Sequence, residues 1–140
     1  MDVSEIVAEM RAVMAQERGI GIAAPQIGEM LRIIVGQGGN DGWDFLLINP
    51  TIKKASEQMT LADEGCLSFP KMCPTYSQDG SMLREGKTVR VRRHKLISMR
   101  GYDVNWESIT VNGRGWLGIC MQHEHDHLDG ITLENYRTKD

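Results

Sequence analysis

The run His-Glu-His-Asp-His at residues 123–127 contains a His-Glu-x-x-His motif, the pattern in this sequence with the clearest chemical meaning. On an α-helix, His123 and His127 lie about one turn apart, so both imidazoles project from one face. Two such imidazoles can share a divalent ion, and Glu124 beside the first can reach a water on that ion. The motif therefore predicts a metal-dependent hydrolase.

A catalytic site of this type needs a third protein ligand. The metzincin pattern would place a histidine at position 133, where this chain has Leu133. Only 13 residues follow His127, which leaves no room for a later helix carrying a thermolysin-like glutamate. The third ligand is therefore expected upstream of the motif.

Cys66 is the upstream residue best suited to this role, because it follows a glycine in the loop-like run Glu-Gly-Cys-Leu-Ser at 64–68. A thiolate binds borderline and soft divalent ions strongly. Cys120 competes by position, one turn before His123, but it falls where the helix should pack its core. We expect Cys120 and Cys73 to be structural.

The chain as a whole predicts one globular domain over residues 1–140, with 41% hydrophobic and 25% charged residues. No apolar run approaches membrane-spanning length, and the acidic N-terminus suits neither a signal peptide nor a transit peptide. Three irregularly spaced cysteines favour reduced thiols over a disulfide framework. These features predict a cytoplasmic protein.

The net charge of −3 is unevenly distributed, because residues 71–95 hold seven Lys or Arg against two acids. This segment could face RNA or another anionic partner. It is also typical of a solvated β-hairpin, and the near absence of aromatic residues, apart from Tyr76, weakens the RNA alternative.

The hydrophobic pattern predicts an α+β fold: an amphipathic N-terminal helix, several mostly antiparallel β-strands and a central metal-binding helix. The first helix is expected to begin with a capping box at Asp2 and Glu5 and to stop near Gly19. Turn residues separate the strands. The expected strands are residues 32–35, 45–48, 88–91, 96–102 and 106–111, and the metal-binding helix is 113–128.

Three segments together resemble the signature motifs of peptide deformylases: Gly-Ile-Gly-Ile-Ala-Ala-Pro-Gln at 19–26, Glu-Gly-Cys-Leu-Ser at 64–68, and Gln-His-Glu-His-Asp-His at 122–127. The likeness covers nearly the whole chain. It implies an enzyme that removes the N-formyl group from formyl-methionine at the start of new polypeptides and releases formate. N-formylmethionyl nascent peptides are the partners that it implies.

Site roles follow from the resemblance position by position. Cys66, His123 and His127 are implied as ligands of one divalent ion, which in this family is usually Fe²⁺, with Zn²⁺ and Ni²⁺ forms also known. Glu124 is implied as the general acid/base for attack by a metal-activated hydroxide, a role typically worth roughly 10²–10⁴ in rate.

Other positions are implied to bind the substrate. Gln26 and the backbone N–H of Leu67 are implied as donors to the formyl oxygen. Glycines at 19 and 21 would let a peptide backbone approach closely. Asp126 and Asp129 are candidates for orienting a ligand imidazole. The residues expected to contact the substrate are Ile20, Gly21, Ile22, Trp116 and Ile119, with Cys120 at the same pocket.

The chain also departs from typical bacterial members. It begins almost inside the first helix and ends at Asp140, so it resembles phage-encoded or organelle-type forms. Ribosome docking through a C-terminal helix is therefore not expected, although the ribosome stays a candidate partner. We expect the protein to be a monomer. We expect it to act in bacterial or phage-infected cytoplasm, with an organelle as the alternative. The longer span between Cys66 and His123 predicts an extended hairpin or loop within 71–87.

Two other functions stay open at this stage. A small zinc endopeptidase would share the helix motif but needs a ligand that the tail does not supply. An RNA-binding protein with a purely structural metal would explain the basic segment, but it would need neither Glu124 nor Gln26.

Overall fold

The computed structural model describes residues 1–38, 42–65, 75–76, 82–84 and 89–136. Its helices are α1 (Ser4–Gln16) and α2 (Gly115–Leu128), with short 3-10 turns η1 (Ala24–Ile27) and η3 (Leu133–Tyr136). Its strands are β1 (Gly21–Ala23), β2 (Ile33–Gly38), β3 (Trp43–Ala55), β4 (Met59–Glu64), β5 (Thr75–Tyr76), β6 (Met82–Arg84), β7 (Val89–His94), β8 (Leu96–Tyr102) and β9 (Ser108–Arg114).

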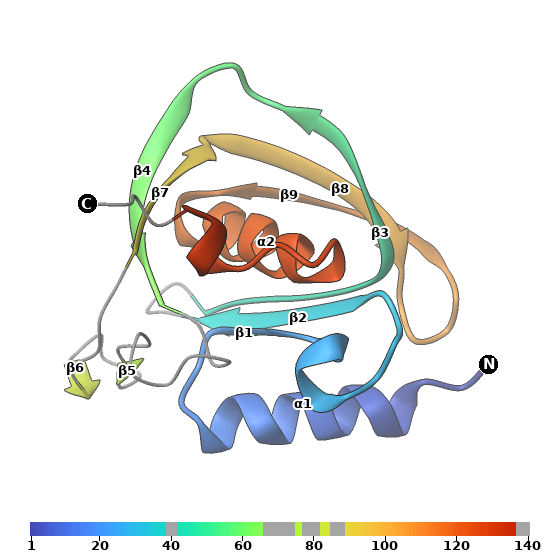
Figure 1. The fold of residues 1–140 in the computed structure, drawn as a ribbon. Coiled ribbons are helices and arrows are strands. Elements are labelled where there is room, and N and C mark those ends of the chain that lie inside the picture. The colour runs from blue at the N-terminus through green and yellow to red at the C-terminus, as the bar shows by residue number, and fades with distance from the viewer. Residues whose placement is uncertain (39–41, 66–74, 77–81, 85–88, 137–140) are drawn as a thin grey trace.

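The strands pair antiparallel throughout the described part of the chain. A five-stranded sheet has the order β1-β2-β3-β8-β9, and β4 pairs with β7. Figure 1 shows α2 in the hollow formed by these curved strands, while α1 lies on the other side of β1 and β2. The predicted α+β fold with its central metal-binding helix is confirmed.

Two hydrophobic clusters hold these layers together. One packs α1 through Val7, Met10 and Met14 against β1 and β2. The other packs α2 through Cys120 and Met121 against the inner face of the five-stranded sheet. Both faces of β1 and β2 are therefore covered, which fixes β1 firmly beside α2.

The amphipathic α1 is confirmed, but its predicted capping box is wrong. The residue preceding the helix is Val3, and no side chain caps the helix there. Asp2 instead accepts a hydrogen bond from the backbone N–H of Ser4 at 2.9 Å. The helix ends at Gln16, close to the predicted stop.

Strand β3 is much longer than predicted, because it continues past Pro50 to Ala55. The register with β8 shifts between Ile48 and Thr51, which marks a bulge at this point. Asn49 adopts φ 53° there, and Pro50 needs no ladder donor at a bulge. The bulge lets one strand turn the corner of the sheet without ending.

The remaining strands differ mainly at their ends. β8 has the predicted bounds, whereas β1 was missed because it has only three residues and β4 was missed because an acidic residue, Glu64, occupies its buried face. β5 and β6 pair antiparallel, as expected for a hairpin within 71–87. No helix in the described residues is long and apolar enough to cross a membrane.

Candidate metal centre

Helix α2 carries the three residues of the motif into the interior of the fold. His123 and His127 are each 8% exposed, and Glu124 is 4% exposed. Their candidate ligand atoms all lie within 4.8 Å of one another, an arrangement that could hold a metal ion. The predicted convergence of His123, Glu124 and His127 is therefore present in the fold.

The two imidazoles have the spacing that a shared ion requires. Nε2 of His127 lies 3.2 Å from Nε2 of His123, and the rings meet edge to face. Two nitrogens that are each about 2.0–2.1 Å from a tetrahedral ion would lie about 3.4 Å apart. The observed separation fits such an ion with little adjustment.

Glu64, at the end of β4, determines the tautomer of His123. Its Oε1 lies 2.8 Å from Nδ1 of His123. Burial alone would raise the pKa of Glu64, but hydrogen bonds from Arg93 and His123 outweigh burial and lower it. An ionised carboxylate only accepts, so Nδ1 carries the proton and Nε2 keeps its lone pair for a metal.

His127 is also held in the form that binds metals. Burial, with repulsion from His123 and Arg93, lowers the pKa of His127 to about 4. The imidazole is therefore neutral at pH 7, and a neutral imidazole is the form that coordinates a metal.

The carboxyl group of Glu124 is buried and incompletely hydrogen-bonded among the described residues. Its Oε1 is buried and has no hydrogen-bond partner among the described residues. Burial raises the pKa of Glu124 to about 7. A carboxyl group that titrates near neutral pH can both accept and return a proton, and an unsatisfied buried oxygen fits a site that takes a cation or a water.

Strand β1 packs directly over Glu124, and this contact requires a glycine. A Cβ placed on Gly21 would lie 2.6 Å from Sγ of Cys120 and would also clash with Oε2 of Glu124. The edge of the five-stranded sheet therefore runs against the candidate catalytic carboxylate.

Comparison with known proteins agrees with this geometry. The sequence profile of the family described as Polypeptide deformylase matches residues 1–76 and 74–139. This chain belongs to the polypeptide deformylase family. The family removes N-formyl groups from nascent peptides and depends on a metal, so the enzyme class predicted from the motifs is confirmed over the endopeptidase and RNA-binding alternatives.

Individual deformylases resemble the chain over most of its length. The peptide deformylase of Thermodesulfovibrio yellowstonii is 36% identical over 135 residues, which cover 94% of this chain and 72% of that protein. That of Wolbachia sp. subsp. Brugia malayi is 32% identical over 148 residues, covering 98% and 74%. The crystal structure of the PDF from a Vibrio parahaemolyticus bacteriophage in complex with actinonin matches with a TM-score of 0.79 and 36% identity, covering 94% of this chain and 84% of that one.

Two residues assigned from the deformylase motifs lie outside the described residues. These are the predicted third ligand Cys66 and the predicted donor Leu67; Cys73 also lies there. Glu64, two positions before Cys66 in sequence, does reach the site through His123. The roles of Cys66 and Leu67 therefore stay predictions.

Gln26 lies in the 3-10 turn η1, immediately after β1. Its Oε1 accepts a hydrogen bond from the backbone N–H of Ala23 at 2.7 Å. The amide nitrogen is then the donor end of this side chain, and the donation from Gln26 to the formyl oxygen stays a prediction.

The residues predicted to contact the substrate differ in how exposed they are. Ile20 is exposed just before β1, and its carbonyl accepts a weak hydrogen bond from the Cys120 thiol at 3.4 Å. Trp116 is exposed and Ile119 half-buried on α2. The side chain of Ile22 is 1% exposed and packs in the cluster with α1, and its predicted substrate contact stays a prediction.

Cys120 lies in the hydrophobic core, and its structural role stays a prediction. It is buried against β1 and the sheet, and burial raises the pKa of its thiol well above the usual value. A neutral thiol is a poor metal ligand. Leu133, the position that excluded a metzincin, is 1% exposed in a small core with Val89 and Val91.

The prediction that Asp126 or Asp129 orients a ligand imidazole is wrong. Asp129 pairs with Arg32, which also donates a hydrogen bond to the carbonyl of Leu128 at the end of α2. Asp126 instead pairs with Arg93 at 2.6 Å. Glu64 instead lies within hydrogen-bonding distance of His123, a predicted ligand, although its motif alone indicated no role for it.

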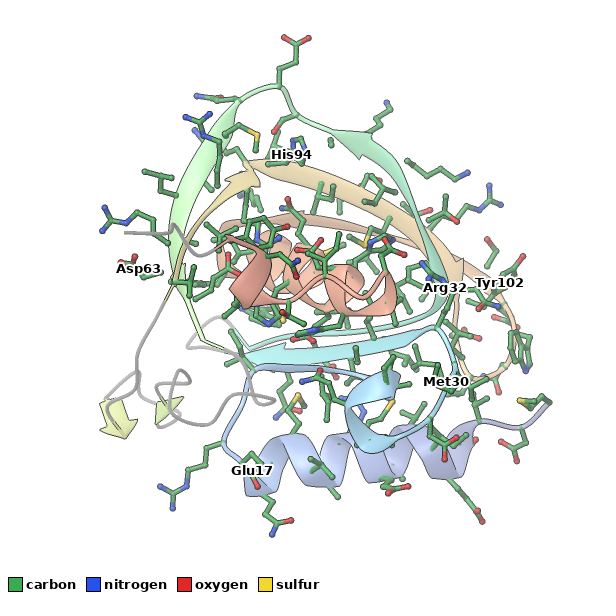
Figure 2. The ribbon with its side chains drawn as sticks, viewed as in Figure 1. Glu17, Met30, Arg32, Asp63, His94 and Tyr102 are labelled. Atoms are coloured by element: carbon green, nitrogen blue, oxygen red, sulfur yellow. The ribbon has the colours of Figure 1, made fainter. Side chains whose placement is uncertain are left out.

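The alternation of buried and exposed residues along β4 and β7 could have identified Glu64 and Arg93 as a buried pair. Val89, Val91 and Arg93 alternate on the buried face of β7, and Ala62 and Glu64 on the buried face of β4. A buried arginine requires an acidic partner. Asp63 points outward from β4 instead, as Figure 2 shows, and pairs with the exposed Arg90.

Proposed function

We propose that this deformylase hydrolyses the formamide bond of N-formylmethionyl peptides, with Glu124 as general acid/base and with Cys66, His123 and His127 as ligands of one divalent ion. The observation that carries the proposal is the pair of Nε2 atoms 3.2 Å apart beside a buried Glu124 oxygen that has no hydrogen-bond partner among the described residues. Glu64 supports it by holding the proton of His123 on Nδ1.

A bound divalent ion would supply two effects at this site, a lower pKa for a coordinated water and polarisation of the formyl carbonyl. We propose Fe²⁺ as the physiological ion, with Zn²⁺ or Ni²⁺ as alternatives. Two neutral imidazoles and a thiolate form a donor set that accepts any of the three.

Glu124 would move the proton. Its carboxylate accepts a proton from the attacking water and returns it to the departing amine as the carbon–nitrogen bond breaks, which yields formate and a free N-terminus. In the metal-free protein, burial raises the pKa of Glu124 to about 7, so this carboxyl group can both take up and release a proton near neutral pH. Removing such a group typically costs roughly 10²–10⁴ in rate.

Gln26 and the Leu67 backbone N–H would stabilise the oxygen of the formyl group as charge develops on it. Each donor of this kind is typically worth on the order of 10²–10³ in rate. The Ala23 bond to Oε1 of Gln26 supports this role, because it orients the amide.

The substrate backbone would approach at β1, where Gly21 leaves room beside Glu124. Ile20, Trp116 and Ile119 would contact the peptide, and Ile22 would contribute only its backbone. We further propose that residues 1–140 act as one catalytic domain, as a monomer, on nascent chains in the cytoplasm.

The test is formate release from a formyl-Met peptide by protein purified without oxygen, paired with elemental metal analysis. We expect wild type to turn over with one ion per chain and Glu124→Gln to keep its metal while losing at least about 10²-fold in turnover. Cys66→Ser should lower metal content, with Cys73→Ser as the matched control. Near-normal turnover by Glu124→Gln would reject the proposed role.

A further inference from the structure

The 3-10 turn η3 follows the metal-binding helix and packs back onto β7. Leu133 anchors it, at 1% exposure, against Val89 and Val91. Tyr136, at the end of the turn, packs partly against the same cluster. The turn is thereby held beside the buried face of β7, where Arg93 lies.

The hydroxyl of Tyr136 joins a buried charge network. It donates to Oδ2 of Asp126 at 2.7 Å, and Nη1 of Arg93 donates to the same oxygen at 2.6 Å. The guanidinium of Arg93 also lies over the Tyr136 ring, 5.1 Å from its centroid. Burial and the bond to Asp126 raise the pKa of Tyr136 to about 12, so the hydroxyl stays a donor.

The other edge of Arg93 holds Glu64. Nε donates to Oε2 of Glu64 at 2.9 Å and Nη2 donates to Oε1 at 2.7 Å, which makes a two-point fork. Oε1 of Glu64 is the same atom that accepts from His123. A continuous chain of hydrogen bonds therefore runs from Tyr136 through Asp126, Arg93 and Glu64 to His123, a candidate metal ligand.

This network places one buried cation between two carboxylates. Burial opposes the charge on Arg93, but Glu64 and Asp126 outweigh burial and raise its pKa. Arg93 must divide its donors between the two acids, so the strength of its bond to Asp126 affects its bond to Glu64. The Tyr136 hydroxyl supplies Asp126 with a second donor and so satisfies part of the charge that would otherwise attract Arg93.

We propose that Tyr136 is a positioning residue for the metal centre, because it balances Arg93 between Asp126 and Glu64 and so keeps Glu64 aligned with Nδ1 of His123. This inference rests on the proposed function, since it takes His123 as a ligand. Loss of the hydroxyl would draw Arg93 toward Asp126 and loosen the fork that holds Glu64.

Tyr136→Phe is the informative variant, because it keeps the ring over Arg93 and removes only the hydroxyl. The measurement is the dissociation constant of Co²⁺ from the metal-free chain by competition with a coloured chelator, together with the Co²⁺ absorption spectrum. Outer partners of metal-binding histidines are worth 10–100-fold in affinity, so we expect Tyr136→Phe to weaken Co²⁺ roughly tenfold and to alter the spectrum.

Leu133→Val is the matched control, since it weakens the packing of the same turn and leaves every hydrogen bond in place. We expect it to lower the melting temperature without changing Co²⁺ affinity. Asp126→Asn provides a second route to the network: its effect and that of Tyr136→Phe should be non-additive in the double variant, because both act through Arg93.

The inference is overturned if Tyr136→Phe changes Co²⁺ affinity less than twofold, or if Leu133→Val weakens binding as much. Full additivity of Tyr136→Phe and Asp126→Asn would overturn it as well. A wild type that binds one Co²⁺ but releases no formate would reject the proposed function and leave this inference standing, whereas a wild type that binds no ion would reject both.

Discussion

Glu64 Oε1 lies 2.8 Å from Nδ1 of His123, although the two residues are 59 positions apart in the chain. This contact joins the end of β4 to the middle of α2. It fixes the proton on one nitrogen of His123 and leaves the other with its lone pair, so this candidate ligand is oriented for a metal before any ion binds.

Glu64→Gln should therefore weaken metal binding although Glu64 is not itself an expected ligand. The glutamine keeps the size of the side chain but loses the charge that accepts from both His123 and Arg93. We expect Co²⁺ or Zn²⁺ affinity to fall roughly 10–100-fold in a chelator competition assay. Asp63→Asn is the control, because its pair with Arg90 is on the surface and should leave affinity unchanged.

Alanine variants of the three histidines of α2 should differ in their metal content. His123→Ala and His127→Ala are each expected to lose stoichiometric metal. His125→Ala, one residue from the same motif, should retain it, since His125 contacts Asp129 and not the cluster. Retention of metal by either of the first two variants would contradict the assigned site.

Removal of the metal ion should also lower the free energy of unfolding, and this effect should depend on the predicted ligand histidines. An ion present at 100 times its dissociation constant stabilises a folded protein by about 2.7 kcal/mol. Wild type should gain this amount on adding metal to the chelated protein in urea titrations. His127→Ala should gain nothing, and an equal gain there would indicate that the ion binds elsewhere.

Gly21→Ala should reduce turnover sharply, because the added Cβ meets the carboxylate of Glu124 and the thiol of Cys120. Gly42→Ala is a useful control, since Gly42 has a positive φ but no atom within 4 Å of an added Cβ. It should cost roughly 1 kcal/mol of stability and leave formate release intact. Similar turnover in both variants would show that β1 does not limit the position of Glu124.

The metal-free protein should show a pH dependence that originates at Glu124. Burial raises its folded-state pKa from 4.5 to about 7, so its contribution to stability is fully present below pH 4.5 and is lost as pH rises through 7. The shift corresponds to about 3 kcal/mol. The free energy of unfolding of wild type minus that of Glu124→Gln should fall across this window.

The difference between the two proteins is the quantity to measure, because His127 has the opposite trend. Its pKa is lowered to about 4, so its contribution is lost as pH falls from 6.5. This term is common to both proteins and cancels. A flat difference between pH 4.5 and 7 would contradict the burial argument.

Sequence patterns located the helix motif and the overall fold class, because both depend on local spacing. The bounds of β8 followed from its regular alternation of exposed and buried residues. Strand β3 was cut short in the prediction, since Pro50 ends strands in general and only the bulge beside Asn49 permits it here.

The supporting residues of the centre were harder to predict, because their meaning depends on pairing between distant strands. Asp126 lies next to a predicted ligand in sequence, yet it faces Arg93. Glu64 lies far away and faces His123. Proximity in the sequence favoured Asp126 as the carboxylate that orients a histidine. Glu64 reaches His123 instead, and its position depends on the register of β4 with β7.

The enclosure of α2 by strands from both halves of the chain has a consequence for folding. The carboxylate that prepares His123 arrives only when a loop of 59 residues has closed, and closing long loops is slow compared with forming a helix. A transient helix carrying the two histidines would still lack its orienting partner. High-affinity metal uptake should therefore occur late in folding, and its rate would report the docking of the β4–β7 pair onto the helix.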